Sequence, residues 1–85
     1  MPTYTVKVAK AADRQIDALD GSVRPRVIRA IQALKEEPRP AGCKKLVGAD
    51  LWRIRIGFYR VVYTINDGNL MVLVVKVGHR REIYR

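Results

Sequence analysis

Three arginines alternate with apolar residues in the stretch LWRIRIGFYRVVYTI, residues 51–65. Successive side chains of a β-strand point to opposite faces, so Arg53 and Arg55 share one face. The break at Gly57-Phe58 predicts a tight turn, and Arg60 then falls inside a second strand. A guanidinium group is a rigid, forked donor that matches the oxygens of a phosphate. The stretch therefore predicts an anion site on a β-hairpin.

The register of this hairpin brings like charges together. If Gly57-Phe58 is a two-residue turn, Arg55 lies directly opposite Arg60, and Arg53 lies one pair further along the same face. The other face then forms the core side, with Trp52, Ile54, Val61 and Tyr63. Opposed like charges destabilise a sheet, so stability alone does not account for this pair. The alternative to an anion site is a solvated outer face whose arginines splay into water.

The remaining patterns predict the elements that must hold this hairpin. Residues 3–8 alternate as a strand, and residues 9–19 have apolar residues at helical spacing. Ser22 is the expected N-cap of a second helix, which Pro38 and Pro40 end. Further strands are expected at 44–47, 51–56, 59–65 and 70–77, and the last is so apolar that we place it mid-sheet, covered on both sides. The result is an α+β fold over residues 1–85, a single domain in which an N-terminal strand and a two-helix hairpin precede a four-strand antiparallel meander. One antiparallel sheet carries the helices on one face.

Bulk properties narrow the function classes. The chain has 85 residues and 17 Lys and Arg against eight Asp and Glu, a net charge of +9. This excess favours a polyanionic partner, either nucleic acid or an acidic protein. One cysteine and one histidine allow neither an internal disulfide nor a structural zinc cage. No apolar run approaches the roughly 20 residues of a membrane span, and the N-terminus lacks a signal-peptide core, so we expect a cytoplasmic protein with no membrane partner.

Two motifs are more specific than these patterns. The segments G-x-Y-R-V-V-Y (57–63) and V-G-H-R-R-x-I-Y (77–84), together with the layout of nearly the whole chain, resemble the RelE/ParE toxin superfamily and, within it, the RelE branch. The resemblance implies an endoribonuclease, an mRNA interferase that enters the ribosomal A site and cuts the codon there. A ribose 2′-OH would attack the adjacent 3′-phosphate, which requires no metal and no cofactor. A cognate RelB-like antitoxin would hold the enzyme inactive.

The resemblance also assigns roles to residues. Arg53, Arg55, Arg60 and Arg80 match the family's basic active-site positions, and Tyr84 matches its C-terminal tyrosine. Arg60 and Arg80 would serve the scissile phosphate and the leaving group, and Arg53 and Arg55 the attacking side or flanking phosphates, while Tyr84 would stack on a base or orient the 2′-OH. Some relatives have lysines in place of Arg53 and Arg55, and arginine cannot act as a base. His79 is therefore a candidate general base, or else a capping residue after the last strand. Peripheral contacts to RNA are expected from Lys44, Lys45, Arg81 and Arg85.

Two other functions compete with this interpretation. A ParE-like toxin would share the fold and inhibit DNA gyrase without cutting RNA, although such an inhibitor needs no phosphate-binding cluster. A non-catalytic RNA-binding module would more usually expose aromatic side chains along its sheet. Fold and charge alone do not separate these functions.

Overall fold

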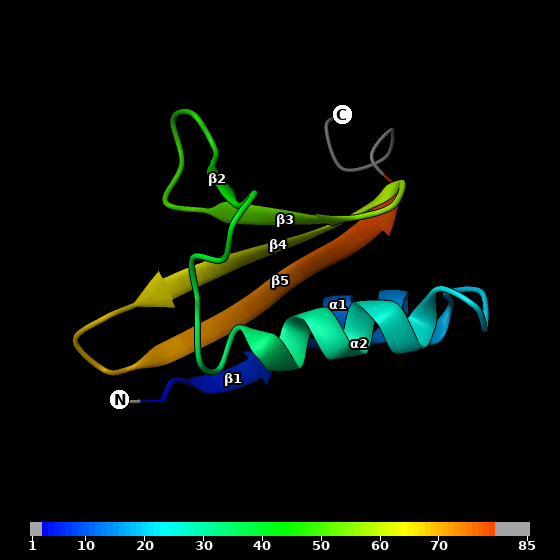
Figure 1. The fold of residues 1–85 in the computed structure, drawn as a ribbon, viewed down its shortest axis with the longest axis horizontal. Coiled ribbons are helices and arrows are strands. Elements are labelled where there is room, and N and C mark those ends of the chain that lie inside the picture. The colour runs from blue at the N-terminus through cyan, green and yellow to red at the C-terminus, as the bar shows by residue number, and fades with distance from the viewer. Residues whose placement is uncertain (1–2, 80–85) are drawn as a thin grey trace.

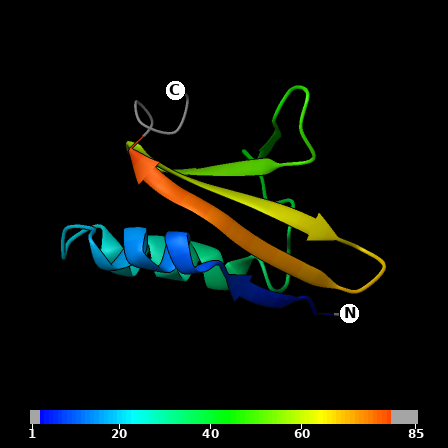
Figure 2. The same cartoon turned by 180° about the vertical axis from the view of Figure 1, so that it is seen from behind.

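The computed structural model describes residues 3–79, which form a five-stranded mixed sheet with two helices on one face (Figure 1). The same two layers are seen from behind in Figure 2. The elements in chain order are β1 (Thr5–Val8), α1 (Lys10–Asp17), α2 (Arg24–Ala33), β2 (Lys44–Lys45), β3 (Trp52–Ile56), β4 (Tyr59–Asn66) and β5 (Met71–His79). Within residues 3–79, neither helix is long and apolar enough to cross a membrane.

The two helices bury one stripe each against the sheet. Helix α1 buries Ala12 and Ile16, and α2 buries Val27 and Ile31, in both cases at the i, i+4 spacing of a single helix face. The predicted N-cap at Ser22 is wrong, because the cap position of α2 is Val23, which makes no side-chain cap. The Ser22 hydroxyl donates instead to Asp20, at 3.3 Å between oxygens.

The sheet order is β1-β5-β4-β3-β2. The predicted antiparallel meander of β2 to β5 is confirmed, although β2 has two residues where a strand over 44–47 was expected. The expectation of a wholly antiparallel sheet is wrong, because β1 pairs with β5 in parallel. The chain leaves β1 through the helices, crosses to the far edge and returns through the meander, so β5 arrives beside β1 pointing the same way.

A β-bulge in the pairing of β4 with β5 decides which side chains of β5 face the core. Val62 pairs with Lys76, but the next residue of β4, Tyr63, pairs with Val74, so Val75 is the extra residue. Val72, Val74 and Val77 are consequently all buried, whereas Lys76 is exposed on the face away from the helices. β5 lies inside the sheet as predicted, but the exposed Lys76 shows that the expected cover on both sides is incomplete.

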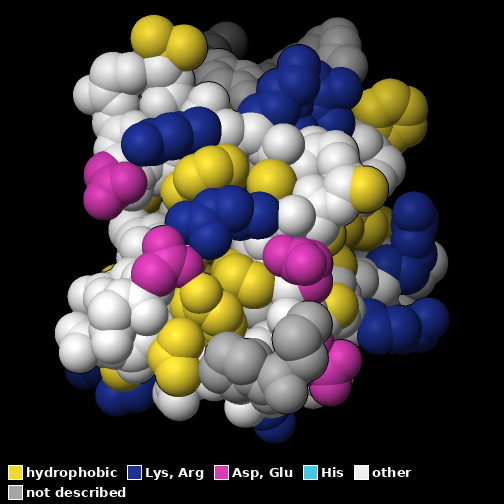
Figure 3. Space-filling model, turned by 60° about the vertical axis from the view of Figure 1, so that its left-hand side comes forward, with side chains coloured by type: hydrophobic (Ala, Val, Ile, Leu, Met, Phe, Trp, Pro, Cys, Tyr) yellow, Lys and Arg dark blue, Asp and Glu magenta, His cyan; other side chains and the backbone are white. Residues whose placement is uncertain are grey.

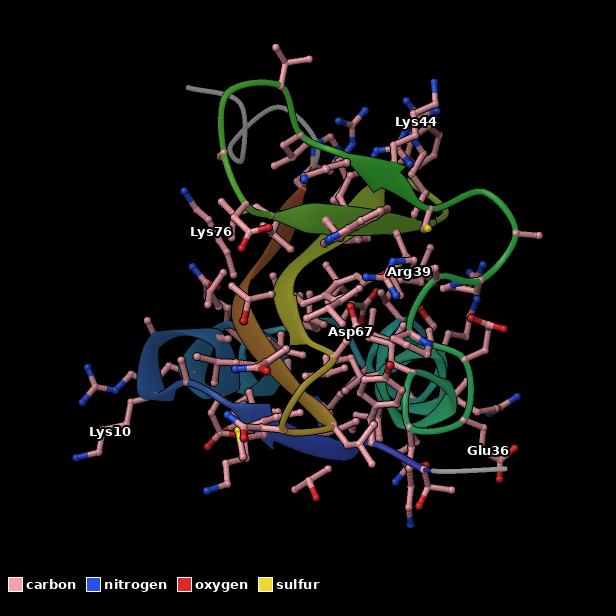
Figure 4. All side chains as sticks on the ribbon, turned by 90° about the vertical axis from the view of Figure 1, so that its left-hand side faces the viewer. Lys10, Glu36, Arg39, Lys44, Asp67 and Lys76 are labelled. Atoms are coloured by element: carbon pink, nitrogen blue, oxygen red, sulfur yellow. The ribbon has the colours of Figure 1, made fainter. Side chains whose placement is uncertain are left out.

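A polar cluster fastens the segment after α2 to the turn between β4 and β5. Arg39 donates to both carboxylate oxygens of Asp67, at 3.2 and 2.9 Å, and the Tyr4 hydroxyl donates to the same carboxylate at 2.6 Å. Figure 4 shows Arg39 and Asp67 pointing toward one another. The Arg39 and Tyr4 hydrogen bonds lower the pKa of Asp67 to about 2, and the bond to Asp67 raises the pKa of Tyr4. On this side of the molecule, charged side chains of both signs are interspersed with apolar surface (Figure 3).

Tyr63 and Trp52 support the same segment from the core side. Tyr63 is fully buried and its hydroxyl donates to the Pro38 carbonyl at 2.7 Å. Burial is also the main reason that the pKa of Tyr63 is raised. Trp52 packs against the core as predicted, and the Arg39 guanidinium lies 4.9 Å above its ring. The segment leading from α2 to β2 is thus held at several points before it reaches the arginines of β3.

Candidate phosphate-binding site

The predicted register of the arginine hairpin is confirmed. Arg55 pairs with Arg60, Ile54 with Val61, and Arg53 with Val62. Across the next strand, Arg60 pairs with Gly78, which has no side chain to cover the guanidinium group from that side. Neighbouring strands lie about 4.8 Å apart, so Arg55 and Arg60 are close neighbours on the face away from the helices.

A second row of cations crosses the sheet beside this pair. It follows the pairings of Lys44 with Arg53, Arg53 with Val62, and Val62 with Lys76. Rows two residues apart on a strand are separated by about 7 Å. Two adjacent rows therefore bring five cations from four strands to one face, which we call the basic cluster: Lys44, Arg53, Arg55, Arg60 and Lys76.

The members of the basic cluster differ in how firmly they are held. Arg53 and Arg60 are only 5% and 7% exposed, whereas Arg55, Lys44 and Lys76 reach into water. The Arg53 guanidinium donates to the Gly42 carbonyl at 3.1 Å, so the segment after α2 orients it. A fixed, partly desolvated cation acts on a nearby negative charge more strongly than one in bulk water. Arg53 and Arg60 thus form the buried part of the site, and the three exposed cations form its solvent-accessible rim.

His79 is placed at the same end of the sheet but on the other face. It pairs with Tyr59, one step along β4 from Arg60, and side chains one step apart point to opposite faces. Its ring stacks on Phe58 at 6.2 Å between centroids and meets the Tyr59 ring edge-on at 5.6 Å. The register thus does not bring His79 together with the basic cluster, and its catalytic role stays a prediction.

The two predicted lysines of β2 also lie on opposite faces of the sheet. Lys44 shares the face of Arg53, whereas Lys45 shares the face of Trp52 and lies 5.9 Å from that ring. The Lys45 ammonium is also 4.0 Å from the Asp50 carboxylate. Lys44 therefore joins the basic cluster and Lys45 does not. The other predicted site residues lie outside the described residues 3–79: Arg80, Arg81, Tyr84 and Arg85.

Sequence reasoning missed Lys76 and the carbonyl of Gly42. Strict alternation along β5 places Lys76 on the same face as Val72 and Val74, and only the bulge moves it to the basic cluster. A single lysine inside an almost continuous apolar run was the available signal, since a cation is rarely buried unpaired. For Gly42 the sequence carried no such signal.

The fold and the basic cluster define a small basic α+β protein with a candidate phosphate site, and comparison with known proteins identifies its family. Residues 6–84 match a family model described as the ParE toxin of the type II toxin–antitoxin system parDE. The chain therefore belongs to the RelE/ParE family of type II toxins.

Several individual relatives of this chain have Rel names. The chain is 33% identical over 86 residues to the toxin RelG of Mycobacterium tuberculosis, covering 96% of this chain and 97% of the relative. The RelE–RelB complex of Pyrococcus horikoshii superposes with a TM-score of 0.82 at 30% identity, covering 94% of this chain and 97% of that one. The RelBE2 toxin–antitoxin complex of M. tuberculosis gives a TM-score of 0.81 at 30% identity, with coverage of 92% and 99%.

Proposed function

We propose that this toxin is a ribosome-dependent mRNA endonuclease of the RelE type, which cleaves the codon in the A site. The observation that carries the proposal is the basic cluster, in which two nearly buried arginines and three exposed cations occupy one face. A phosphodiester gains negative charge as it is attacked, and fixed cations stabilise that charge. An inhibitor that only covers a protein surface would not need guanidinium groups opposed across two strands.

The reaction that fits these residues is an internal transfer. The ribose 2′-oxygen bonds to the adjacent phosphorus while the bond from phosphorus to the 5′-oxygen breaks, which leaves a 2′,3′-cyclic phosphate and a 5′-hydroxyl. The 2′-OH gives up a proton to a base, and the leaving oxygen takes one up. In this proposal Arg60 and Arg80 bind the scissile phosphate and the leaving-group side, and Arg53 and Arg55 the attacking side. Tyr84 stacks on a base, and His79 is the candidate base.

The ribosome has a physical role in this scheme. The basic cluster supplies positive charge, which by itself does little to align the 2′-oxygen with the phosphorus. Orientation of reacting groups can supply about 7–11 kcal/mol of a barrier, and the A site would provide it. Naked mRNA should accordingly be cut far more slowly than mRNA on programmed ribosomes.

The antitoxin belongs to the same proposal. Several similar structures are complexes of RelE with RelB, including the intact RelBE complex of E. coli at 29% identity and a TM-score of 0.76. We propose a RelB-like partner that docks an amphipathic helix on apolar surface and sets acidic residues against the basic cluster. Because the proposed targets, the ribosome and mRNA, are cytoplasmic, we also propose that the protein acts in the cytoplasm.

The deciding experiment uses purified toxin, programmed ribosomes and end-labelled mRNA under single-turnover conditions. Wild-type toxin should cut in the A site, and Arg60→Gln should be slower by about 10² or more, the usual loss for a preorganised transition-state donor. Arg14→Gln removes the same charge from an exposed position of α1 and should cut normally. Intact mRNA together with inhibited gyrase supercoiling would assign the toxin to the ParE type. This outcome is tested because the matching family model is described as a ParE toxin.

His79 needs a separate test, because its ring lies on the other face of β5. If it is the base, His79→Gln should remove the limb of the pH–rate profile that reports a group titrating near neutral pH. An unchanged profile would exclude His79 as the base and would agree with a structural role for its ring, which contacts Phe58 and Tyr59.

A further inference from the structure

A shallow groove runs between helix α2 and the outer edge of β3. One end, about 480 Å³, is lined by Arg26, Arg29, Ala30, Ala33, Arg55, Ile56 and Gly57. The other end, about 440 Å³, shares Ala30, Ala33 and Arg55 and continues past Pro40, Ala41, Gly42, Arg53 and Ile54. We call the whole surface the α2–β3 groove. It follows the strand edge, so residues from both faces of β3 line it, and Arg55 belongs to the groove and to the basic cluster.

Three guanidinium groups gather at one end of the α2–β3 groove. Arg26 and Arg29 are three residues apart on α2 and so project from one side of the helix. Arg26 reaches across to the turn between β3 and β4, where its guanidinium lies 3.8 Å from the position that a Cβ on Gly57 would take. Arg55 completes the group from the strand.

These three arginines differ from their neighbours in having no assigned structural task. Arg24 donates to the carbonyls of Asp17 and Leu19 and so closes the end of α1, and Arg39 is bound to Asp67. Within residues 3–79, no ion pair or side-chain hydrogen bond satisfies Arg26, Arg29 or Arg55. Between Asp20 and Glu36 the sequence contains no acidic residue at all. Three cations therefore converge here without an acidic partner among residues 3–79.

The groove between these arginines suits a thin, charged ligand. Its lining includes two small residues, Ala30 and Ala33, which allow a ligand backbone to approach closely. It offers no large apolar pocket of the kind that anchors a protein partner. The exposed Ile28 of α2 lines a different groove, on the side of β1. Charge without an apolar anchor favours a phosphodiester backbone over an acidic polypeptide.

We infer that the α2–β3 groove binds the phosphodiester backbone of the RNA strand that continues from the basic cluster. Arg55 would contact phosphates in both places, and Arg26 and Arg29 would hold phosphates further along the strand. The inference rests on the proposed function, because it takes an RNA strand at the basic cluster as its starting point. It extends that function by giving the toxin a binding track longer than the cleaved bond.

The test measures binding without cleavage, so that it is independent of catalysis. A fluorescent 12-nucleotide single-stranded RNA with 2′-O-methyl riboses is titrated with wild-type toxin and with the double variant Arg26→Gln/Arg29→Gln. The matched control, Lys10→Gln/Arg14→Gln, loses the same charge from exposed positions of α1. Losing two phosphate contacts should weaken binding about 10-fold and lower the slope of log K against log salt by about 1.4. The control should change much less, and a trinucleotide should bind both double variants alike.

Four results would overturn the inference. An equal loss in the control would show that only net charge matters, and an equal loss with the trinucleotide would place the two arginines at the basic cluster itself. Unchanged binding of the 12-mer would show that the groove does not bind the RNA strand. If vacant ribosomes nevertheless bound the variant more weakly, the two arginines would be assigned to structured ribosomal RNA instead. If the double variant bound poly-glutamate more weakly in the same titration but bound the 12-mer normally, the groove would be assigned to an acidic polypeptide. Failure of the proposed function is measured separately, as absence of A-site cleavage by the wild-type toxin.

Discussion

Replacing Arg55 with glutamine should make the folded protein slightly more stable. Arg55 lies directly opposite Arg60 across β3 and β4, and its side chain is in water. Two like charges about 5 Å apart, the spacing of neighbouring strands, repel in water by about 0.8 kcal/mol, which agrees with the few tenths to 1 kcal/mol expected of opposed like charges in a sheet. We therefore expect Arg55→Gln to raise the free energy of unfolding by about 0.5 kcal/mol.

Urea unfolding at two salt concentrations measures this gain and its cause. At about 1 M salt the Debye length falls to about 3 Å, so the repulsion and the gain should both vanish. Arg55→Lys keeps the charge and should give no gain at either concentration. A loss above about 1 kcal/mol in Arg55→Gln, or a gain that persists in high salt, would refute the repulsion argument.

Arg60 should behave in the opposite way, although it belongs to the same pair. It is 7% exposed, so Arg60→Gln removes packed atoms and changes a buried polar group. Such a change costs about 1–3 kcal/mol, more than the relief of repulsion returns. If Arg55→Gln and Arg60→Gln raised the free energy of unfolding equally, the burial of Arg60 would contribute nothing to stability.

Three further changes test other parts of the structure. The folded-state pKa of Asp67, about 2, lies below its ordinary value of 3.8. The ionised Asp67 carboxylate therefore stabilises the folded protein fully above about pH 4, and this stabilisation is lost as the pH falls toward 2. In urea unfolding across this range, the free energy of unfolding should fall less in Asp67→Asn than in wild type. Tyr63→Phe leaves the buried Pro38 carbonyl without its donor and should lower the free energy of unfolding by about 1–2 kcal/mol in a urea titration. Lys76→Gln should slow single-turnover cleavage about 10-fold, less than the loss of a preorganised donor, while Lys7→Gln on β1 leaves it unchanged.

Each of these has a contradicting result. Identical acid profiles for wild type and Asp67→Asn would mean that the carboxylate is not held as the structure places it. A neutral Tyr63→Phe would mean that water satisfies the Pro38 carbonyl. Equal cleavage by the Lys76 and Lys7 variants would exclude Lys76 from the site.

The sequence predicted the hairpin well because its register depends on local information. A two-residue turn at Gly57-Phe58 determines every pair along β3 and β4, so the opposition of Arg55 and Arg60 followed from the turn alone. The same alternation separated Trp52 and Ile54, which face the core, from the arginines between them.

The errors arose where the outcome depends on distant parts of the chain. Nothing in residues 3–8 indicates whether β1 runs parallel or antiparallel to its neighbour, because β5 is its partner. The sequence gives no signal for the bulge at Val75, since valine suits either face of a strand. The bulge places Lys76 on the face of the basic cluster. Ser22 has the chemistry of a cap, but the helix begins one residue later than that prediction requires.

The order of the sheet has a consequence for how the toxin is made. Among the described strands, β1 pairs only with β5, and β5 follows every other strand in the sequence. Contacts this far apart in the chain form slowly, because the whole intervening segment must be closed into a loop first. A chain whose synthesis stops before residue 71 contains the arginines of β3 and β4, but lacks Lys76 and leaves both β1 and β4 with unpaired edges. Interrupted translation therefore yields an unfinished sheet, and the five described strands can pair in full only after β5 has been synthesised.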